Sequence, residues 1–306
     1  MQHAPQIRLT TSPGTPLERL PIDSEQPLFQ DAEVVEDATL RARQVPGDPE
    51  AGVAAFLDGT QETRILAVVG PAPLIEGRTA AAIRVRRGRQ LCVWGLPLKQ
   101  ERLYAPFPYI PRDVLVGYFG ASLVDTAIPD ADGDLPKPHP MTLLECAKRA
   151  ISHDRDGLER RLAETWCSSE SAPLYIDGGI GTTEVVARAT CAIGVIKSHR
   201  TLYVENAALD TVLSLRAGQR SSVMRIAPRK IPVLSWYLRL RDTAGHDGLW
   251  GLVRVEVAEQ SDVTARADRV SRWVMAEAKP LSAPDARWDK MAYGVRNTEE
   301  FLRAIM

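Results

Sequence analysis

Residues 56–59 read Phe-Leu-Asp-Gly and residues 175–178 read Tyr-Ile-Asp-Gly, so a short apolar run ends in aspartate followed by glycine in both places. We interpret each run as a buried strand with a carboxylate at its end. The strand holds such a carboxylate rigidly, and the glycine lets a ligand or another backbone approach closely. One Asp-Gly pair after a strand is more often a simple turn, but two matched copies favour a shared role.

Paired aspartates of this kind indicate metal chemistry. Two carboxylates held side by side repel each other unless a cation lies between them. The hard ions Mn²⁺ and Mg²⁺ prefer oxygen ligands, and one or two such ions can activate water against a phosphodiester. Asp58 and Asp177 are therefore predicted as metal ligands and catalytic residues. This hypothesis requires the two aspartates to meet across neighbouring strands.

A third predicted strand, residues 191–197, ends in lysine where the other two end in aspartate. At that position Lys197 could neutralise charge that develops on a phosphate or orient the attacking water. The alternative is an ordinary solvated lysine at the end of a strand.

The order of the predicted elements indicates an α/β fold. Residues 1–50 are rich in proline, glutamine and acidic residues and lack periodicity, so they are expected to form an extended or loosely packed arm. Residues 51–306 then alternate short apolar strands with amphipathic helices, typical of a mixed sheet flanked by helices. Residues 99–140, with many prolines, are expected to be an insertion or long loop.

Several boundaries are specific enough to test. Residues 53–58 and 64–69 are predicted to form a hairpin around Asp58-Gly59-Thr60, and a second turn is expected at Arg87-Gly88-Arg89. Apolar spacing predicts one helix over residues 141–166, with a potential break near Asp156-Gly157. The remaining predictions are an antiparallel strand pair, 231–241 with 249–257, and helices at 205–217, 262–278 and 297–305.

The bulk composition fits a cytoplasmic protein. The chain has 306 residues, of which 44% are hydrophobic and 25% charged, enough for one large α/β core. No leader or membrane-spanning run is recognisable, so we expect a cytoplasmic location and no membrane contact. The four cysteines form no C-x-x-C pair, so neither a zinc site nor a disulfide framework is expected and the thiols are taken to be reduced.

Charge is unevenly distributed along the chain, although the net charge is only -1. Residues 18–50 carry nine acidic and three basic side chains, whereas residues 197–241 carry nine basic and two acidic ones. Basic stripes of this kind suit a phosphate backbone, but solvated faces paired with local acids give the same pattern. The candidate nucleic-acid-binding residues are Arg86, Arg87, Arg89, His199, Arg200, Arg239 and Arg241.

Four phrases together resemble the NurA family of DNA-end-processing nucleases, whose core is similar to RNase H and PIWI domains. They are FLDGT at 56–60, LYIDGGIG at 174–181, AIGVIKSH at 192–199 and YLRLRD at 237–242. The resemblance implies an RNase H-like nuclease domain in which Asp58 and Asp177 bind manganese. It also implies a third acid on the helix before the central strand, and Glu159 stands at a similar distance from Asp177. A solvated helix acid beside Arg155 and Arg160 is the alternative for Glu159.

The resemblance further implies a homodimer that docks on a HerA-like hexameric ATPase, which feeds DNA to the nuclease in end processing or phage defence. The chain has no G-x-x-x-x-G-K-[ST] phosphate loop, so a partner must supply that motor. The sequence departs from the family pattern near its end, because no histidine follows His246. Asp285 or Asp289 could replace the missing ligand.

Two other functions stay open at this stage. The same core could cleave RNA or an RNA-DNA hybrid. Alternatively, the chain could be a catalytically inactive subunit that grips nucleic acid or a partner with its basic stripes. The missing histidine favours the inactive subunit, whereas retention of both Asp-Gly sites argues against it, because binding alone does not need acids that repel phosphate.

Overall fold

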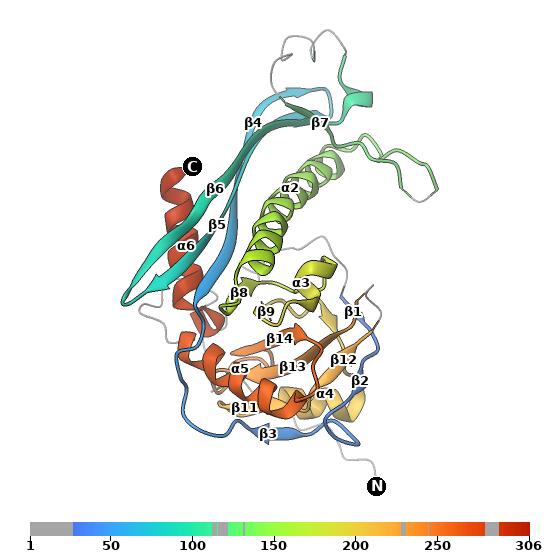
Figure 1. The fold of residues 1–306 in the computed structure, drawn as a ribbon. Helices are drawn as coiled ribbons and strands as arrows, with labels where there is room; N and C mark the ends of the chain where they lie inside the picture. The colour runs from blue at the N-terminus through green and yellow to red at the C-terminus, as the bar shows by residue number, and fades with distance from the viewer. Residues whose placement is uncertain are drawn as a thin grey trace. The chain divides into compact units, whose positions relative to one another are not determined.

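The computed structural model describes residues 27–111, 115, 122–130, 132–227, 231–243, 245–278 and 288–306. The chain divides into two compact units (Figure 1). Unit 1 comprises residues 1–54 and 167–296, and unit 2 comprises residues 55–166 and 297–306. Each unit combines a sheet with both parallel and antiparallel neighbours and packed helices, so the predicted α/β class with a mixed sheet flanked by helices is confirmed.

Unit 2 is built on a long antiparallel meander of β4 (Ala55–Val69), β5 (Ala72–Arg87) and β6 (Gln90–Ala105). Strand β7 (Leu123–Asp125) adds to β6 in parallel. The β5–β6 turn is at Arg87-Gly88-Arg89, as predicted, and Gly88 adopts a φ of +61° that favours glycine. Because β6 continues to Ala105, the predicted insertion at residue 99 begins later, with the short helix η2 (Phe107–Tyr109).

The hairpin predicted at Asp58-Gly59-Thr60 is wrong. Strand β4 runs straight through these residues, with Asp58 opposite Ala82 and Gly59 opposite Ala81, and the chain reverses instead at Gly70, where φ is +58°. Cross-strand pairing with β5 along almost all of β4 outweighs the local turn preference of an Asp-Gly pair. Asp58 therefore lies inside a strand and not at its end.

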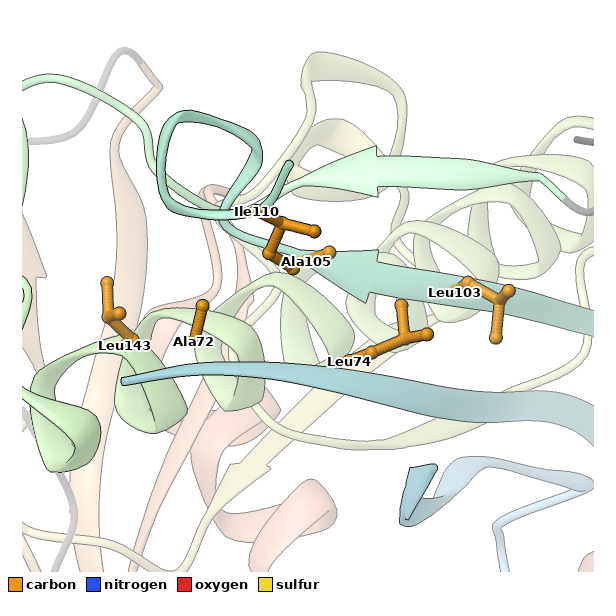
Figure 2. Close-up of a cluster of buried hydrophobic side chains, with 6 residues drawn as sticks. All are labelled: Ala72, Leu74, Leu103, Ala105, Ile110 and Leu143. Atoms are coloured by element: carbon orange, nitrogen blue, oxygen red, sulfur yellow. The ribbon is translucent and has the colours of Figure 1, made fainter. Parts of the chain in front are cut away.

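Two helices cover the faces of this meander (Figure 1). Helix α2 (Pro140–Ser169) is continuous through Gly157, without the predicted break, and its Ala147 and Ile151 pack with Ile75 and Tyr104. Helix α6 (Tyr293–Ile305) places Leu302 against Ala80 and Ala82. A further apolar cluster joins the start of β5, the end of β6 and the first turn of α2 (Figure 2); its buried members are Ala72, Leu74, Leu103, Ala105, Ile110 and Leu143.

Unit 1 contains the parallel pair β8 (Leu174–Asp177) and β9 (Ala192–Ile196). Antiparallel neighbours extend the sheet from β9 to β14 (Leu252–Ala258), β13 (Val233–Arg239), β12 (Met224–Ile226) and β2 (Glu33–Val34). Strand β11 (Gln219–Ser221) pairs with β13 and with β3 (Ala42–Gln44). The predicted antiparallel pair of residues 231–241 and 249–257 is confirmed as β13 and β14.

Helices flank the unit 1 sheet on both faces. Helix α5 (Val263–Glu277) receives a hydrogen bond from Trp236 Nε1 of β13 to Ser271 Oγ at 2.9 Å. Arg239, three residues further along β13, points to the other face and donates to Leu213 O at the end of α4 (Asn206–Leu213) at 3.0 Å. The short α3 (Glu184–Arg188) is capped by Thr183, whose hydroxyl accepts a hydrogen bond from Val186 N.

The described part of the predicted N-terminal arm contains regular structure. Besides β2 and β3, β1 (Leu28–Phe29) pairs with β10 (Thr201–Leu202). The fully buried Arg220 donates to both carboxylate oxygens of Glu36, at 2.7 and 2.8 Å, and to Asp268 at 2.7 Å. Such pairing between distant residues leaves no local periodicity in the sequence. Residues 1–26 of the predicted arm lie outside the described residues.

Within the ranges that the structure describes, none of the helices has both the length and the apolar character needed to cross a membrane.

Candidate metal centre

In unit 2, two carboxylates gather around Gly59. Asp58 Oδ1 accepts a hydrogen bond from the Gly59 N–H at 2.9 Å. Glu159 reaches the same residue from α2, because a Cβ placed on Gly59 would lie 2.1 Å from Glu159 Oε1. The glycine therefore creates the space that the Glu159 carboxylate occupies. Two acids about a hundred positions apart in sequence thus both lie next to Gly59 of β4.

The β-strand geometry decides how these acids approach. Successive side chains leave opposite faces of a strand, so Asp58 starts on the face where Ala82 packs against Leu302, whereas Gly59 faces α2. The hydrogen bond to Gly59 N turns the Asp58 carboxylate back toward the strand backbone. Both carboxylates consequently lie next to Gly59, although they approach it from different sides.

Arg155 supplies the positive charge of this cluster. Its guanidinium lies 3.4 Å from Glu159 Oε1, one helical turn away, and 2.8 Å from Asp156 Oδ1. Burial lowers the pKa of Arg155, but the hydrogen bond to Asp156 and the charges of Glu159, Asp156 and Asp58 outweigh it and raise the pKa above its ordinary value. Glu159 is 21% exposed at its side chain. It is therefore partly buried and paired with Arg155, which agrees with the alternative of a helix acid beside Arg155 except that the carboxylate is only partly solvated.

In unit 1, Asp177 ends β8 as predicted, and Gly178 follows with a φ of +141°. Lys197 Nζ donates to Asp177 Oδ2 at 2.8 Å, with side chains only 10% and 23% exposed for the lysine and the aspartate. The parallel pairing of β8 and β9 sets Asp177 beside Val195, two residues before Lys197. The structure therefore brings together the acid and the cation that the sequence assigned to neighbouring strand ends.

A close backbone approach supports this end of β8. Gly178 N donates to Val195 O at 3.1 Å, and a Cβ on Gly194 would lie 2.7 Å from Gly178 O. Only glycine at position 194 leaves room for the chain that leaves Asp177. Close packing against Gly178 therefore accounts for the glycine in the AIGVIKSH phrase, Gly194.

Lys290 lies next to the Asp177–Lys197 pair and was missed by the sequence reasoning. Its Nζ is 3.5 Å from Lys197 O. Burial lowers the pKa of Lys290 below its ordinary value, against the opposing charges of Asp289 and Asp247. Its only sequence signal was its place beside Asp289, which is too weak to identify it.

Asp289 has a structural role in this fold. Its side chain is 4% exposed, and Oδ2 accepts a hydrogen bond from Gly251 N at 2.7 Å, which secures the start of β14. Asp289, which was predicted to replace the missing histidine ligand, is therefore bonded through Oδ2 to the backbone. Asp285, the other candidate, lies outside the described residues.

The donor set at Gly59 fits a hard divalent ion held by few protein ligands. Across the described ranges, no group of three or more His, Cys, Asp or Glu side chains is arranged to hold a metal ion. Mg²⁺ nevertheless binds in many sites through one or two carboxylates, with water and substrate phosphate completing its shell. Asp58 and Glu159 offer such a pair of oxygen ligands. Asp177 offers a single carboxylate whose Oδ2 is already paired with Lys197.

Two predicted nucleic-acid contacts need correction. Arg239 is fully buried, and its guanidinium donates to backbone carbonyls, among them Leu215 O at 3.1 Å and Gly248 O at 2.8 Å. It stabilises the core of unit 1 and has no surface to offer a phosphate. Burial lowers the pKa of His199 to about 4, and its Nε2 lies 2.9 Å from Leu252 O, so the ring is neutral at neutral pH and supplies no positive charge.

The other basic candidates stay available to differing degrees. Arg87 and Arg89 are exposed at the β5–β6 turn of unit 2, whereas Arg86 is half-buried with its guanidinium 5.3 Å from the centre of the Phe56 ring. Arg200 and Arg241 of unit 1 are half-buried, and Arg241 Nη2 donates to Ala278 O at 2.5 Å. The turn is therefore the clearest cationic surface among the predicted residues.

Searches against protein-family models and against curated proteins found no match to this chain. The resemblance to the NurA family therefore stays a prediction from the quoted phrases.

Proposed function

We propose that the chain is a metal-dependent nuclease that hydrolyses DNA phosphodiester bonds with Mn²⁺ or Mg²⁺. The observation that carries this proposal is that β4 and α2 bring the carboxylates of Asp58 and Glu159 next to Gly59, with Arg155 paired to Glu159. Hard divalent ions bind such oxygens, and the bound ion supplies a Lewis acid and an activated water.

The residues of the chain have separate roles in this proposal. Asp58 and Glu159 hold the ion, and Arg155 holds Glu159 in place through its ion pair. Asp177 is the further predicted metal ligand, and Lys197, paired with it, is a candidate for stabilising charge on the phosphate. The hypothesis that Asp58 and Asp177 bind the same ion stays a prediction.

Cleavage of linear DNA in Mn²⁺ by the wild-type chain, Asp58→Asn and Asp177→Asn tests the proposal. We expect cleavage by the wild type and loss of cleavage in both variants. Glu101→Gln, on the same sheet as Asp58, and Asp210→Asn, in α4, serve as controls because both carboxylates are exposed. Equal activity in the wild type and both site variants would end the catalytic proposal.

A double-mutant cycle tests the shared ion. If Asp58 and Asp177 act on one ion, the double variant Asp58→Asn/Asp177→Asn loses no more activity than the worse single variant. Losses that multiply indicate independent action. The same assay with RNA and RNA-DNA hybrid substrates separates a DNA nuclease from the RNase H-like alternative.

The partners are proposed from the family resemblance alone, and the cytoplasmic location is the expectation drawn from the composition of the chain. These proposals comprise a homodimer, a HerA-like hexameric ATPase and a cytoplasmic role in DNA end processing or phage defence. Co-purification with a HerA-like ATPase and the mass of the chain in solution test them. A chain that binds DNA without cleaving it in either metal is the outcome expected of an inactive binding subunit.

A further inference from the structure

The loop between β13 and β14 carries a stacked pair of rings outside the proposed metal centre. The ring centres of His246 and Trp250 are 3.8 Å apart, and their planes are inclined by 13°. Both residues are half-buried, so the pair lies at the surface of unit 1. Because Trp250 covers one face of the imidazole, the second face of His246 is the one on which the stack can continue.

Hydrogen bonds to the backbone hold this loop in place. Trp250 N donates to Asp247 O at 3.2 Å. The fully buried Arg239 donates to Gly248 O at 2.8 Å and also to Trp250 O. The rings are therefore supported by the core of unit 1, and a ligand that stacks on them loses little binding energy to ordering of the loop.

The stack lies at the same edge of the unit 1 sheet as Asp177 and Lys197. Trp250 comes two residues before β14, which starts at Leu252. Leu252 O lies 2.9 Å from Nε2 of His199, two residues after Lys197. The antiparallel pairing of β14 with β9 therefore places the loop beside the end of β9, where Lys197 donates to Asp177.

The chemistry of the loop favours a nucleobase over a phosphate as its ligand. Histidine and tryptophan rings stack on the flat face of any base, as in proteins that bind single strands. The exposed Asp242 and Asp247 belong to the same loop and repel a phosphate backbone. In a duplex the neighbouring bases cover both faces of each base, so the ligand must be a base that has left the stack.

We propose that His246, supported by Trp250, is a stacking platform for an unpaired nucleobase of a DNA strand. The choice of DNA rests on the proposed nuclease function, and the platform adds to it a contact that holds one base beside the Asp177–Lys197 pair. Single-stranded segments and frayed ends are the parts of DNA that fit this contact.

Binding of fluorescein-labelled strands to the full wild-type chain tests the platform without cleavage. With EDTA present to remove divalent metal, fluorescence anisotropy compares a short oligothymidylate with a strand of equal length in which abasic sites replace the bases. We expect the strand with bases to bind about tenfold more tightly. Equal affinity, or no binding of either strand, would overturn the proposal. A chain that shows the preference but cleaves no DNA in Mn²⁺ refutes the nuclease function and supports the platform.

Substitutions at position 246 separate stacking from polar contact. We expect His246→Ala and His246→Gln each to lose about tenfold in affinity for oligothymidylate, whereas His246→Phe keeps the ring and stays within about twofold of the wild type. His153→Ala, at an exposed histidine of α2, is the matched control and should bind like the wild type. Full affinity in His246→Ala, or equal losses in His246→Phe and His246→Ala, contradicts the stacking role. Because a variant could fold poorly, the comparison of the two strands on the wild type decides the proposal without any variant.

Salt dependence distinguishes the platform from a charge contact. Stacking releases no counterions, so the loss in His246→Ala should be the same at low and high salt. The double variant Arg87→Gln/Arg89→Gln, at the exposed β5–β6 turn, is the comparison. Any loss caused by these arginines should shrink as salt rises. A loss in His246→Ala that shrinks in the same way identifies a phosphate contact and refutes the platform.

Discussion

The two Asp-Gly pairs of this chain have almost the same sequence and different structures. Asp58-Gly59 lies inside β4, where Gly59 pairs opposite Ala81, whereas Asp177-Gly178 ends β8, where Gly178 adopts a φ of +141°. Gly59 is needed for the space that Glu159 fills, and Gly178 for its backbone conformation. The comparison teaches that one local phrase can serve two physical needs, and that neighbours distant in sequence decide which.

The charge partners differ in the same way. Asp177 pairs directly with Lys197 from the next strand, at 2.8 Å. Asp58 shares its surroundings with a second acid, Glu159, and the arginine that pairs with it. Asp177 is thus part of an ion pair, whereas the acids next to Gly59 carry an excess of negative charge. The Gly59 cluster is therefore the stronger candidate for holding a cation.

The largest expected effect comes from neutralising either aspartate. We expect Asp58→Asn and Asp177→Asn each to lower Mn²⁺-dependent cleavage by about 10³-fold, since a bound ion contributes several kcal/mol to the transition state. Calorimetric titration with Mn²⁺ separates the contributions of Asp58 and Asp177 to metal binding. A larger loss of affinity in Asp58→Asn supports the Gly59 cluster as the main site, and a loss confined to Asp177→Asn refutes that ranking.

His199, in the same unit as Asp177, should make the stability of the folded chain sensitive to acid. Its pKa is about 4 in the folded chain against an ordinary value of 6.5, so the unfolded chain binds the proton first. The free energy of unfolding is therefore unaffected by His199 above pH 6.5. It decreases as the pH falls toward 4, by up to about 3 kcal/mol, because protonation of His199 favours the unfolded chain. Urea unfolding of wild type and His199→Phe at pH 7 and pH 4.5 measures this change in the free energy of unfolding. The stability of wild type relative to His199→Phe should fall at the lower pH; an unchanged relative stability contradicts the prediction.

Alanine at the two glycines should separate their roles. Gly178→Ala forces a side chain into a left-handed conformation, at a cost of about 1–3 kcal/mol in unfolding free energy. Gly59→Ala meets the flexible side chain of Glu159, so we expect a smaller change in stability but about tenfold weaker Mn²⁺ binding as the carboxylate is displaced. Unchanged Mn²⁺ affinity in Gly59→Ala would show that Glu159 is not a ligand.

The smallest effects are expected from the two cations. Lys197→Met and Arg155→Met each remove an ion pair whose side chains are mostly buried, which costs about 1–2 kcal/mol. Their effects on metal binding should differ in sign. Lys197→Met frees Asp177 and raises its affinity for Mn²⁺, whereas Arg155→Met leaves Glu159 unanchored and lowers affinity. The same sign in both calorimetric titrations refutes this assignment.

Local pattern was sufficient for much of the fold. The helices α2, α5 and α6 follow from apolar spacing, because burial of one helix face imposes a period on the sequence. The strands β8, β9, β13 and β14 follow from short, mainly apolar runs, because these strands are buried on both faces. The turn at Gly88 follows from the glycine itself, because glycine adopts the positive φ of this turn without strain. The break expected in α2 at Gly157 is absent, since packing along a long helix outweighs the modest cost of one glycine.

The N-terminal strands could not be predicted, because β1, β2 and β3 are only two or three residues long and pair with partners far along the chain. The buried Arg239 illustrates the same limit at the candidate surface. Its alternation with apolar residues in YLRLRD fits a half-exposed strand, yet helices cover both faces of β13, and carbonyls of unit 1 satisfy its guanidinium.

The sequence by itself determined the α/β class, the main strands and helices, and the acids and lysine worth testing, because these depend on residue type and short-range periodicity. Only the tertiary structure decided that Asp58 lies within a strand, that Glu159 fills the space at Gly59 and that Lys197 pairs with Asp177. Those contacts join residues tens of positions apart, and no local preference of the chain specifies them.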